Sequence, residues 1–137
     1  MKKHELGALA QFSERYAIPT GDVNARVEQA VLGGAWGANG YTTVAQADEL
    51  GRRLHLGSES LLLDFGSGRG WPGLYLATRT GCSVVCSDMP LAALRVAARR
   101  ATAEAIDDRV RIVAASAAEQ PFAAKSFDAI VHTDVLC

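Results

Sequence analysis

Apolar and polar positions follow two different patterns along the chain. Up to residue 56, apolar side chains recur at helical spacing, as at Leu6, Leu9 and Phe12, whereas short apolar runs alternate with helical stretches from residue 58 onward. The helical stretches predict helices over 5–16, 23–32, 43–54, 72–80 and 90–105. The apolar runs predict buried strands over 61–63, 82–88, 109–115 and 127–133. This alternation favours right-handed crossovers, so the chain is predicted to be an α/β domain with a doubly wound parallel sheet and helices on both faces.

The two parts of this pattern predict a cap region and a sheet region within one domain. Residues 1–56 are expected to form a helical cap over the sheet region of residues 57–137. Asp22 is expected to cap the second helix of this region, and Thr43 forms a capping box with Gln46 at the start of the third.

The helix over 90–105 has a predicted buried face and a predicted solvent face. The buried face is expected to comprise Leu91, Leu94, Ala97, Ala98 and Ala101. The solvent face is expected to comprise Arg95, Arg99 and Arg100.

The rest of the chain is organised around the stretch over 61–73, which reads LLLDFGSGRGWPG. A buried strand is followed by alternating glycines and then by Pro72, which is favoured in the first turn of a helix that Gly81 would end. A strand, a glycine turn and a helix N-terminus together let backbone N–H groups approach a polar ligand closely. The stretch therefore predicts a ligand crevice at the end of the first strand.

Two glycine patterns overlap in this turn. Residues 68–73 fit the dinucleotide fingerprint G-x-G-x-x-G, whereas residues 64–70 fit D-x-G-x-G-x-G, with an acidic residue before the first glycine. The carboxylate of Asp64 suits a ligand with a positive amino group better than a pyrophosphate. Asp88 ends the second predicted strand, where a carboxylate can bind both hydroxyls of a ribose, and this contact serves either kind of ligand.

The pattern over 64–70 resembles motif I of the class I S-adenosylmethionine-dependent methyltransferases. Residues 113–122 and 126–131 are similar to the segment that follows the third strand in small-molecule members of this family. The resemblance covers about residues 58–137. It implies a Rossmann-like doubly wound sheet, corresponding to the N-terminal half of a fold with about seven strands. It also implies transfer of a methyl group from S-adenosyl-L-methionine to a small-molecule acceptor.

The same resemblance implies roles for individual residues. The cofactor would be held by Asp64, Gly66, Ser67, Gly68 and Gly70 at its methionine end, by Asp88 at the ribose, and by Met89, Ser116 and Ala117 at the adenine. Ser116 stands where the family often has an aspartate. His132 and Asp134 follow the fourth predicted strand, where family residues face the transferred methyl group, and they are the expected catalytic residues, with His132 as a general base.

Composition narrows the partners. The formal net charge of −1 provides no electrostatic footprint for nucleic acid or an anionic membrane, and no apolar run approaches the roughly 20 residues of a membrane span. An Asn-Pro-Pro-Tyr type of sequence, found in many enzymes that methylate amino groups, is absent. Neither a signal peptide nor a metal-ligand spacing is found, so a cytoplasmic, metal-free protein with buried reduced cysteines is predicted.

The last predicted strand provides a candidate association surface. If no strand follows the fourth, residues 128–135 form an unpaired apolar edge, and a homo-oligomer through this edge is expected. The chain would then be a fragment or a natural truncation.

Two alternatives to a methyltransferase stay open. One is an oxidoreductase that binds NAD(P), and the other is a catalytically inactive fragment that binds a cofactor.

Overall fold

The structure is a computed structural model that describes residues 3–38 and 40–135. The helices are α1 (Lys3–Ala17), α2 (Asp22–Leu32), α3 (Val44–Arg53), α4 (Gly73–Thr80) and α5 (Leu91–Ala103). The strands are β1 (Leu61–Phe65), β2 (Ser83–Asp88), β3 (Val110–Ala114) and β4 (Ala129–Val131). The predicted α/β alternation is confirmed, although β4 is shorter than the predicted range.

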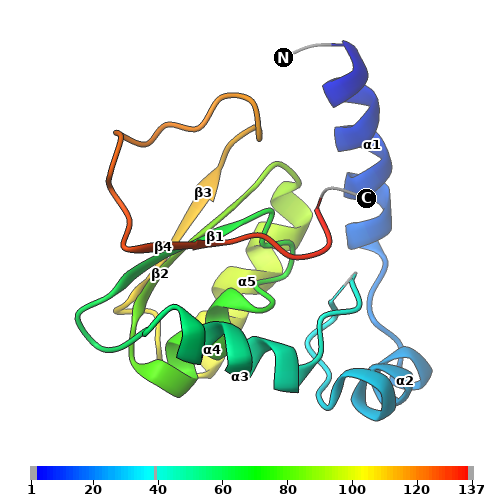
Figure 1. Ribbon diagram of the computed structural model, residues 1–137. Helices are drawn as coiled ribbons and strands as arrows, with labels where there is room; N and C mark the ends of the chain where they lie inside the picture. Colours follow the sequence, from blue (N-terminus) through cyan, green and yellow to red (C-terminus); the bar gives the residue numbers. More distant parts are fainter. Residues whose placement is uncertain (1–2, 39, 136–137) are drawn as a thin grey trace.

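The strands form one parallel sheet in the order β3-β2-β1-β4 (Figure 1). Leu63 of β1 lies opposite Val85 of β2 on one side and Ile130 of β4 on the other. Because all strands run in the same direction, the carboxyl ends of β1 and β2 meet at one edge of the sheet. The glycine turn and Asp88 lie at this edge, which is where ligands bind in open α/β sheets.

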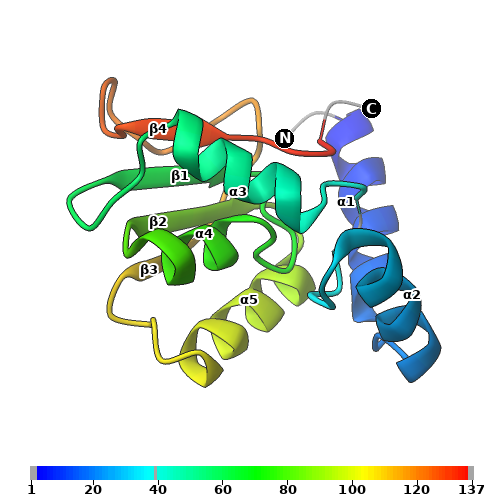
Figure 2. The ribbon, with the colours of Figure 1, turned by 60° about the horizontal axis from the view of Figure 1, so that its bottom comes forward.

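The described helices α3, α4 and α5 cover a single face of the sheet (Figures 1 and 2). The crossovers through α4 and α5 both lead outward from β1 towards β3, so their right-handedness places both helices on the same side. The next connection, residues 115–128, returns past β1 to β4 and therefore crosses the opposite face, but it is irregular rather than helical. The expectation of helices on both faces is thus wrong for the described residues.

The core lies between this helical layer and the sheet. Its fully buried members include Leu62 of β1, Leu74 and Leu76 of α4, and Val84 and Cys86 of β2. Cys82 and Cys86 are buried free thiols, as predicted, and burial raises the pKa of both. Cys137 lies outside the described residues.

The predicted helix ends are partly confirmed. Thr43 and Gln46 form the capping box of α3, and Gly81 ends α4 in the left-handed conformation with its N–H on the Ala77 carbonyl. Asp22, however, is the first residue of α2, whose cap is Gly21. A glycine in extended conformation takes the cap position, so the Asp22 side chain makes no cap hydrogen bond.

The buried face of α5 is rotated from the predicted one. Leu91 and Ala98 are exposed, whereas Ala93 is buried with Leu94 and Ala97. Arg95 and Arg99 face solvent as predicted, but Arg100 is half-buried. Its Nη1 donates to the carbonyls of Trp36 and Arg69, both at 3.0 Å, so a charged side chain is held inside by backbone acceptors.

The helices and the edge strand bear on two further expectations, the absence of a membrane span and the association of two copies. Of the helices described, none is both long and apolar enough to pass through a bilayer. β4 is the edge strand of the described sheet, and Ile130 on it is 57% exposed. Association of two copies through this edge stays a prediction.

Candidate functional site

The glycine turn after β1 is folded back onto the end of β2. Gly66 and Gly68 have φ angles of 76° and 53°, a region that side chains disfavour and glycine tolerates. The N–H groups of Gly66 and Ser67 both donate to the Ser87 carbonyl, at 2.8 and 3.2 Å. The N–H of Gly68 donates to Oδ2 of Asp88 at 2.7 Å, so turn and strand end form one unit.

Asp88 is the acidic centre of this unit. Its Oδ1 accepts the N–H of Met89 at 2.7 Å, in addition to the bond from Gly68 to Oδ2. Burial raises the pKa of the Asp88 carboxyl, and the two N–H groups act in the opposite direction. A carboxylate offers about four lone-pair sites, so two acceptor sites remain for a ligand.

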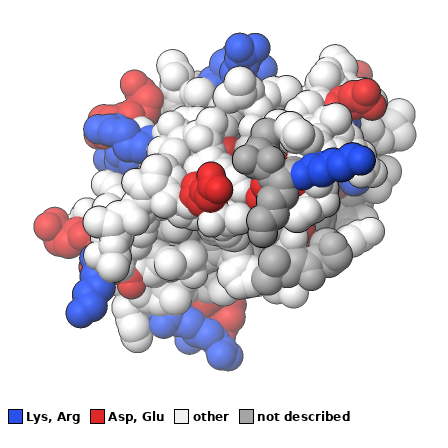
Figure 3. Space-filling model, turned by 90° about the horizontal axis from the view of Figure 1, so that it is seen from above, with Lys and Arg blue, Asp and Glu red and all other residues white. Residues whose placement is uncertain are grey.

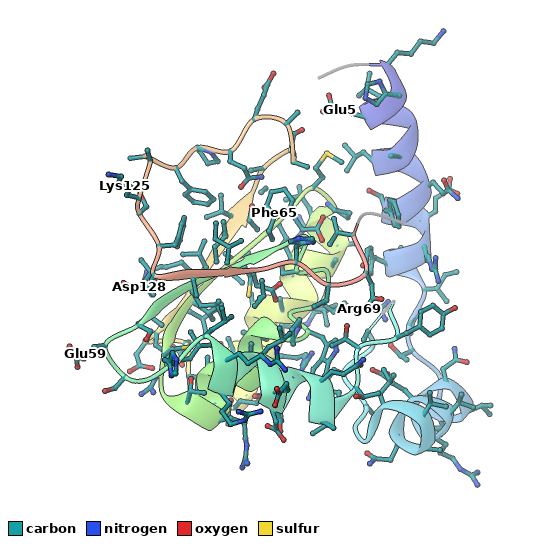
Figure 4. The ribbon with its side chains drawn as sticks, viewed as in Figure 1. Glu5, Glu59, Phe65, Arg69, Lys125 and Asp128 are labelled. Carbon is teal, nitrogen blue, oxygen red and sulfur yellow. The ribbon has the colours of Figure 1, made fainter. Side chains whose placement is uncertain are left out.

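A cavity of about 230 Å³ lies beside Asp88 and Gly66. Phe65, labelled in Figure 4, forms one of its apolar walls. The lining includes five of the predicted site residues: Gly66, Asp88, Met89, Ala117 and Asp134. A smaller adjoining cavity of about 70 Å³ is lined by two more of them, Ser67 and Gly68. Seven predicted residues are thus brought together around two neighbouring cavities.

Asp64 lies beneath the turn and not in either cavity. It is 1% exposed, and its Oδ2 accepts the N–H of Gly73, the first residue of α4, at 2.8 Å. Burial raises the pKa of its carboxyl to about 7, the Gly73 N–H opposes this rise, and the charge of Asp88 adds to it. The geometry therefore has Asp64 holding the turn against the start of α4.

Gly70 also has a packing role in this structure. A Cβ at this position would lie 2.5 Å from Cδ1 of Leu74 and 3.3 Å from Cβ of Ala97. The glycine therefore allows the turn to approach α4 and α5 closely. Like Asp64, Gly70 lines neither of the two cavities.

Ser116 is directed towards the cap. Its hydroxyl donates to Oε1 of Glu5 on α1 at 2.9 Å and accepts the N–H of Ala118 at 3.1 Å. It lines a surface hollow near Leu9 and Leu91, next to the main cavity. The structure thus joins Ser116 to α1, a contact 111 residues away in the sequence.

The two predicted catalytic residues lie in different surroundings. His132 is exposed, and it is on the face of the β4 segment that alternates away from buried Val131, so it lines neither cavity. Asp134 lines both cavities, but its Oδ2 accepts from the N–H groups of Tyr41 and Thr42 and from the Thr42 hydroxyl. The geometry supports Asp134 as a clamp on this loop, and nothing in it brings the His132 ring to the turn.

Asp134→Ala should therefore loosen the loop that the carboxylate holds. Three hydrogen bonds to a charged acceptor are removed, and we expect the free energy of unfolding to fall by about 1–2 kcal/mol. Hydrogen exchange should accelerate at the amides of Tyr41 and Thr42. His132→Ala is the matched control and should leave both measurements unchanged. Equal exchange rates at Tyr41 in all three proteins would contradict the clamp.

The structure adds site residues that the sequence patterns did not indicate. Phe12 and Tyr16 of α1 line both cavities, and Gln120 lines the larger one. Arg69 lines the smaller cavity and reaches from the turn to the cap. One sequence feature points to these contacts: Arg69 is a cation between two glycines of the predicted ligand turn.

Comparisons with known proteins give a consistent result. Residues 62–137 match the family described as "Methyltransferase domain". The chain is 36% identical over 83 residues to methyltransferase GfsG of Streptomyces halstedii, a match that covers 61% of this chain and 30% of that protein. The chain thus spans about a third of the length of this curated relative.

Solved structures with the same fold include enzymes with different acceptors. Geranyl diphosphate C-methyltransferase from Streptomyces coelicolor A3(2) has a TM-score of 0.62 at 23% identity, covering 83% of this chain and 50% of that one. A methyltransferase from Geobacter sulfurreducens in complex with S-adenosyl-L-homocysteine has a TM-score of 0.55 at 26% identity, covering 73% and 37%. An RNA methyltransferase from Salinibacter ruber has a TM-score of 0.55 at 20% identity, covering 58% and 52%.

Proposed function

The chain belongs to the methyltransferase domain family, and from this premise we propose that its crevice binds S-adenosylmethionine and serves methyl transfer to a small-molecule acceptor. The family match covers the glycine turn, Asp88 and β4, which are the segments that carried the resemblance in the sequence. The resemblance to class I methyltransferases is thereby confirmed.

The residues present fit this cofactor. The two remaining acceptor sites of Asp88 suit the two ribose hydroxyls, and the apolar walls that Phe65 and Met89 provide suit a purine face. At Gly66 a Cβ would lie 2.5 Å from Cγ2 of Val135, so glycine lets the turn pack closely against the segment after β4, which forms another part of the cavity wall. These features support a nucleoside in the larger cavity with its polar end towards the turn.

The proposed roles follow from these positions. Asp88 binds the ribose, Met89 and Ala117 flank the adenine, and Gly66, Ser67 and Gly68 line the methionine end. Asp64 and Gly70 act indirectly, because they hold in place the turn that makes these contacts. Ser116 contributes through its bond to Glu5, which fixes α1 beside the cavity.

The cofactor would supply an electrophilic methyl group on its sulfonium sulfur. The chain's own task is then to orient an acceptor in line with this methyl and to keep water out. Phe12 and Tyr16 line the cavities from α1, and Asp134 lines both of them from the segment after β4. Because its Oδ2 is bonded to the loop at Tyr41 and Thr42, Asp134 has the proposed role of holding the cavity wall on the side of the acceptor.

A small-molecule acceptor is supported by the surface as well as by the cavities. Acidic and basic side chains are interspersed on the face shown in Figure 3, and the described residues of that face form no continuous basic patch. The formal net charge of −1 agrees with this distribution. A nucleic-acid acceptor, as named for the Salinibacter ruber enzyme, is the alternative that a methylation assay on RNA would reveal.

The single observation that carries the proposal is the position of Asp88 against the glycine turn, at the carboxyl end of β2 and in the wall of the cavity. Calorimetric titration with S-adenosylhomocysteine, with NADH titrated in parallel, tests it. We expect micromolar binding of S-adenosylhomocysteine and none of NADH. Binding of NADH alone would favour an oxidoreductase, and binding of neither would refute the proposed site.

A further inference from the structure

Helix α1 contributes walls to the cofactor cavity without having a buried core of its own. No residue of this 15-residue helix is buried, yet Phe12 and Tyr16 line both cavities. Isolated helices of about this length are marginal in water, and packing usually stabilises them. Packing against α5 and polar contacts at its two ends therefore hold α1 beside the site.

Arg69 provides such a contact at the carboxyl end of α1. Its Nη2 donates to the carbonyls of Tyr16 and Ile18 at 3.1 and 2.9 Å, and its Nη1 donates to the Thr20 hydroxyl at 2.8 Å. The guanidinium carbon lies 5.4 Å from the centre of the Tyr16 ring. The carboxyl end of a helix has unpaired carbonyls and a partial negative charge. The Arg69 guanidinium therefore stabilises this end both as a hydrogen-bond donor and as a cation.

Arg69 is itself firmly placed, because it belongs to the glycine turn. Its carbonyl accepts from Nη1 of Arg100 at 3.0 Å, and the same nitrogen donates to the Trp36 carbonyl. The neighbouring Gly68 is bonded to Asp88. The side chain thus reaches α1 from the part of the chain that would contact the cofactor.

The other end of α1 is held separately by the bond between Glu5 and Ser116. Figure 4 shows Glu5 and Arg69 towards opposite ends of α1, both between this helix and the sheet region. Tyr16 lies at the Arg69 end, with its hydroxyl 2.7 Å from the position that a Cβ on Gly68 would take. The helix therefore crosses the open side of the cavity and is fastened at both ends.

We propose that α1 is a lid over the cofactor cavity and that Arg69 latches it to the glycine turn. This inference rests on the proposed function for the identity of the ligand. A ligand enclosed beneath Phe12 and Tyr16 leaves only when the latch opens, so Arg69 is a positioning residue that governs release. Lysine replaces it only in part, because a single ammonium nitrogen cannot take both guanidinium positions, Nη2 at the carbonyls of Tyr16 and Ile18 and Nη1 at the Thr20 hydroxyl.

Binding kinetics of S-adenosylhomocysteine on immobilised protein test the latch. For Arg69→Ala we expect the dissociation rate to rise about tenfold or more, with an association rate that is equal or higher. Arg69→Lys should show the same pattern to a lesser degree, and the exposed Arg95→Ala is the matched control. A fall in the association rate with unchanged dissociation would mean a damaged turn, and it would overturn the latch.

Hydrogen exchange of the ligand-free protein tests the lid independently of the cofactor. In Arg69→Ala, amides of α1 should exchange faster than in Arg95→Ala, while those of β1 and β2 keep their protection. Unchanged exchange in α1 overturns the lid. If Arg69→Ala also loosens the strands, Arg69→Lys is judged by the same criteria. If the wild-type protein binds no S-adenosylhomocysteine, the proposed function fails, and the exchange rates still decide on the lid.

Discussion

Asp88→Ala is expected to weaken binding of S-adenosylhomocysteine by about 100-fold or more. Two hydrogen bonds from ribose hydroxyls to a charged acceptor are worth roughly 1.5–3 kcal/mol each, and every 1.4 kcal/mol is tenfold in affinity. The same change removes the acceptor of the Gly68 and Met89 N–H groups, so the turn loses one of its anchors on β2 and keeps those on the Ser87 carbonyl. Calorimetric titration of the variant measures both effects together.

Two further variants separate these contributions. Asp88→Asn retains the shape and one acceptor oxygen, and we expect an intermediate loss of affinity. Asp107→Ala changes an exposed aspartate between α5 and β3 and should bind like the wild type. Unchanged affinity of Asp88→Ala would refute the ribose contact, even if the protein binds the ligand elsewhere.

Stability should fall as the pH rises from about 4 to about 7, because of Asp64. Its pKa is near its ordinary value of 3.8 in the unfolded chain but about 7 in the folded one. Between these values the folded state holds the proton and the unfolded state does not, so the stabilisation present below pH 3.8 is lost by about pH 7. The loss is at most about 1.4 kcal/mol for each pH unit, and the raised pKa of Asp88 acts in the same direction.

Asp64→Asn isolates the contribution of this carboxyl. The amide oxygen can still accept the Gly73 N–H, but the side chain stays neutral at every pH. Urea unfolding at pH 4.5, 6 and 7.5 should show the variant gaining stability relative to the wild type as the pH rises. Asp107→Asn, at an exposed position, should show a constant difference. A constant difference for Asp64→Asn as well would place the pKa of Asp64 near its ordinary value.

The strands and the ligand turn could be predicted because their signals are local. The run at 61–63, the glycines that follow and the acidic residue ending β2 each report on a few neighbouring residues. Since carboxyl ends of parallel strands share one edge, these local signals also place Gly66 and Asp88 together. The fold class and the centre of the site followed from this reasoning.

The contacts across the chain could not be predicted in the same way. Arg100 has the spacing of a surface residue, yet backbone carbonyls from two distant loops hold it inside. Asp134 follows the last strand, where a catalytic group is expected, but its carboxylate is bonded to the loop at Tyr41 and Thr42. Such partners are fixed by tertiary packing, and no periodicity of the sequence contains them.

The one-sided helical layer has a related cause. The hydrophobic pattern shows which residues are buried, but it does not show what buries them. Leu63 and Val85 face away from the helices and are still buried, with the irregular segment 115–128 on their side of the sheet. Continuous apolar strands therefore led to the expectation of a second helical layer.

The most direct test of the central claim is a nuclear magnetic resonance titration of the ¹⁵N-labelled chain with S-adenosylhomocysteine. The amides of Gly66, Gly68, Asp88, Met89 and Ala117 are expected to shift together, since they surround the two cavities. Amides at the start of β3 and in the turn between α5 and β3 lie at the opposite edge of the sheet and should keep their positions. Shifts confined to residues outside the turn and the end of β2 would contradict the proposed site.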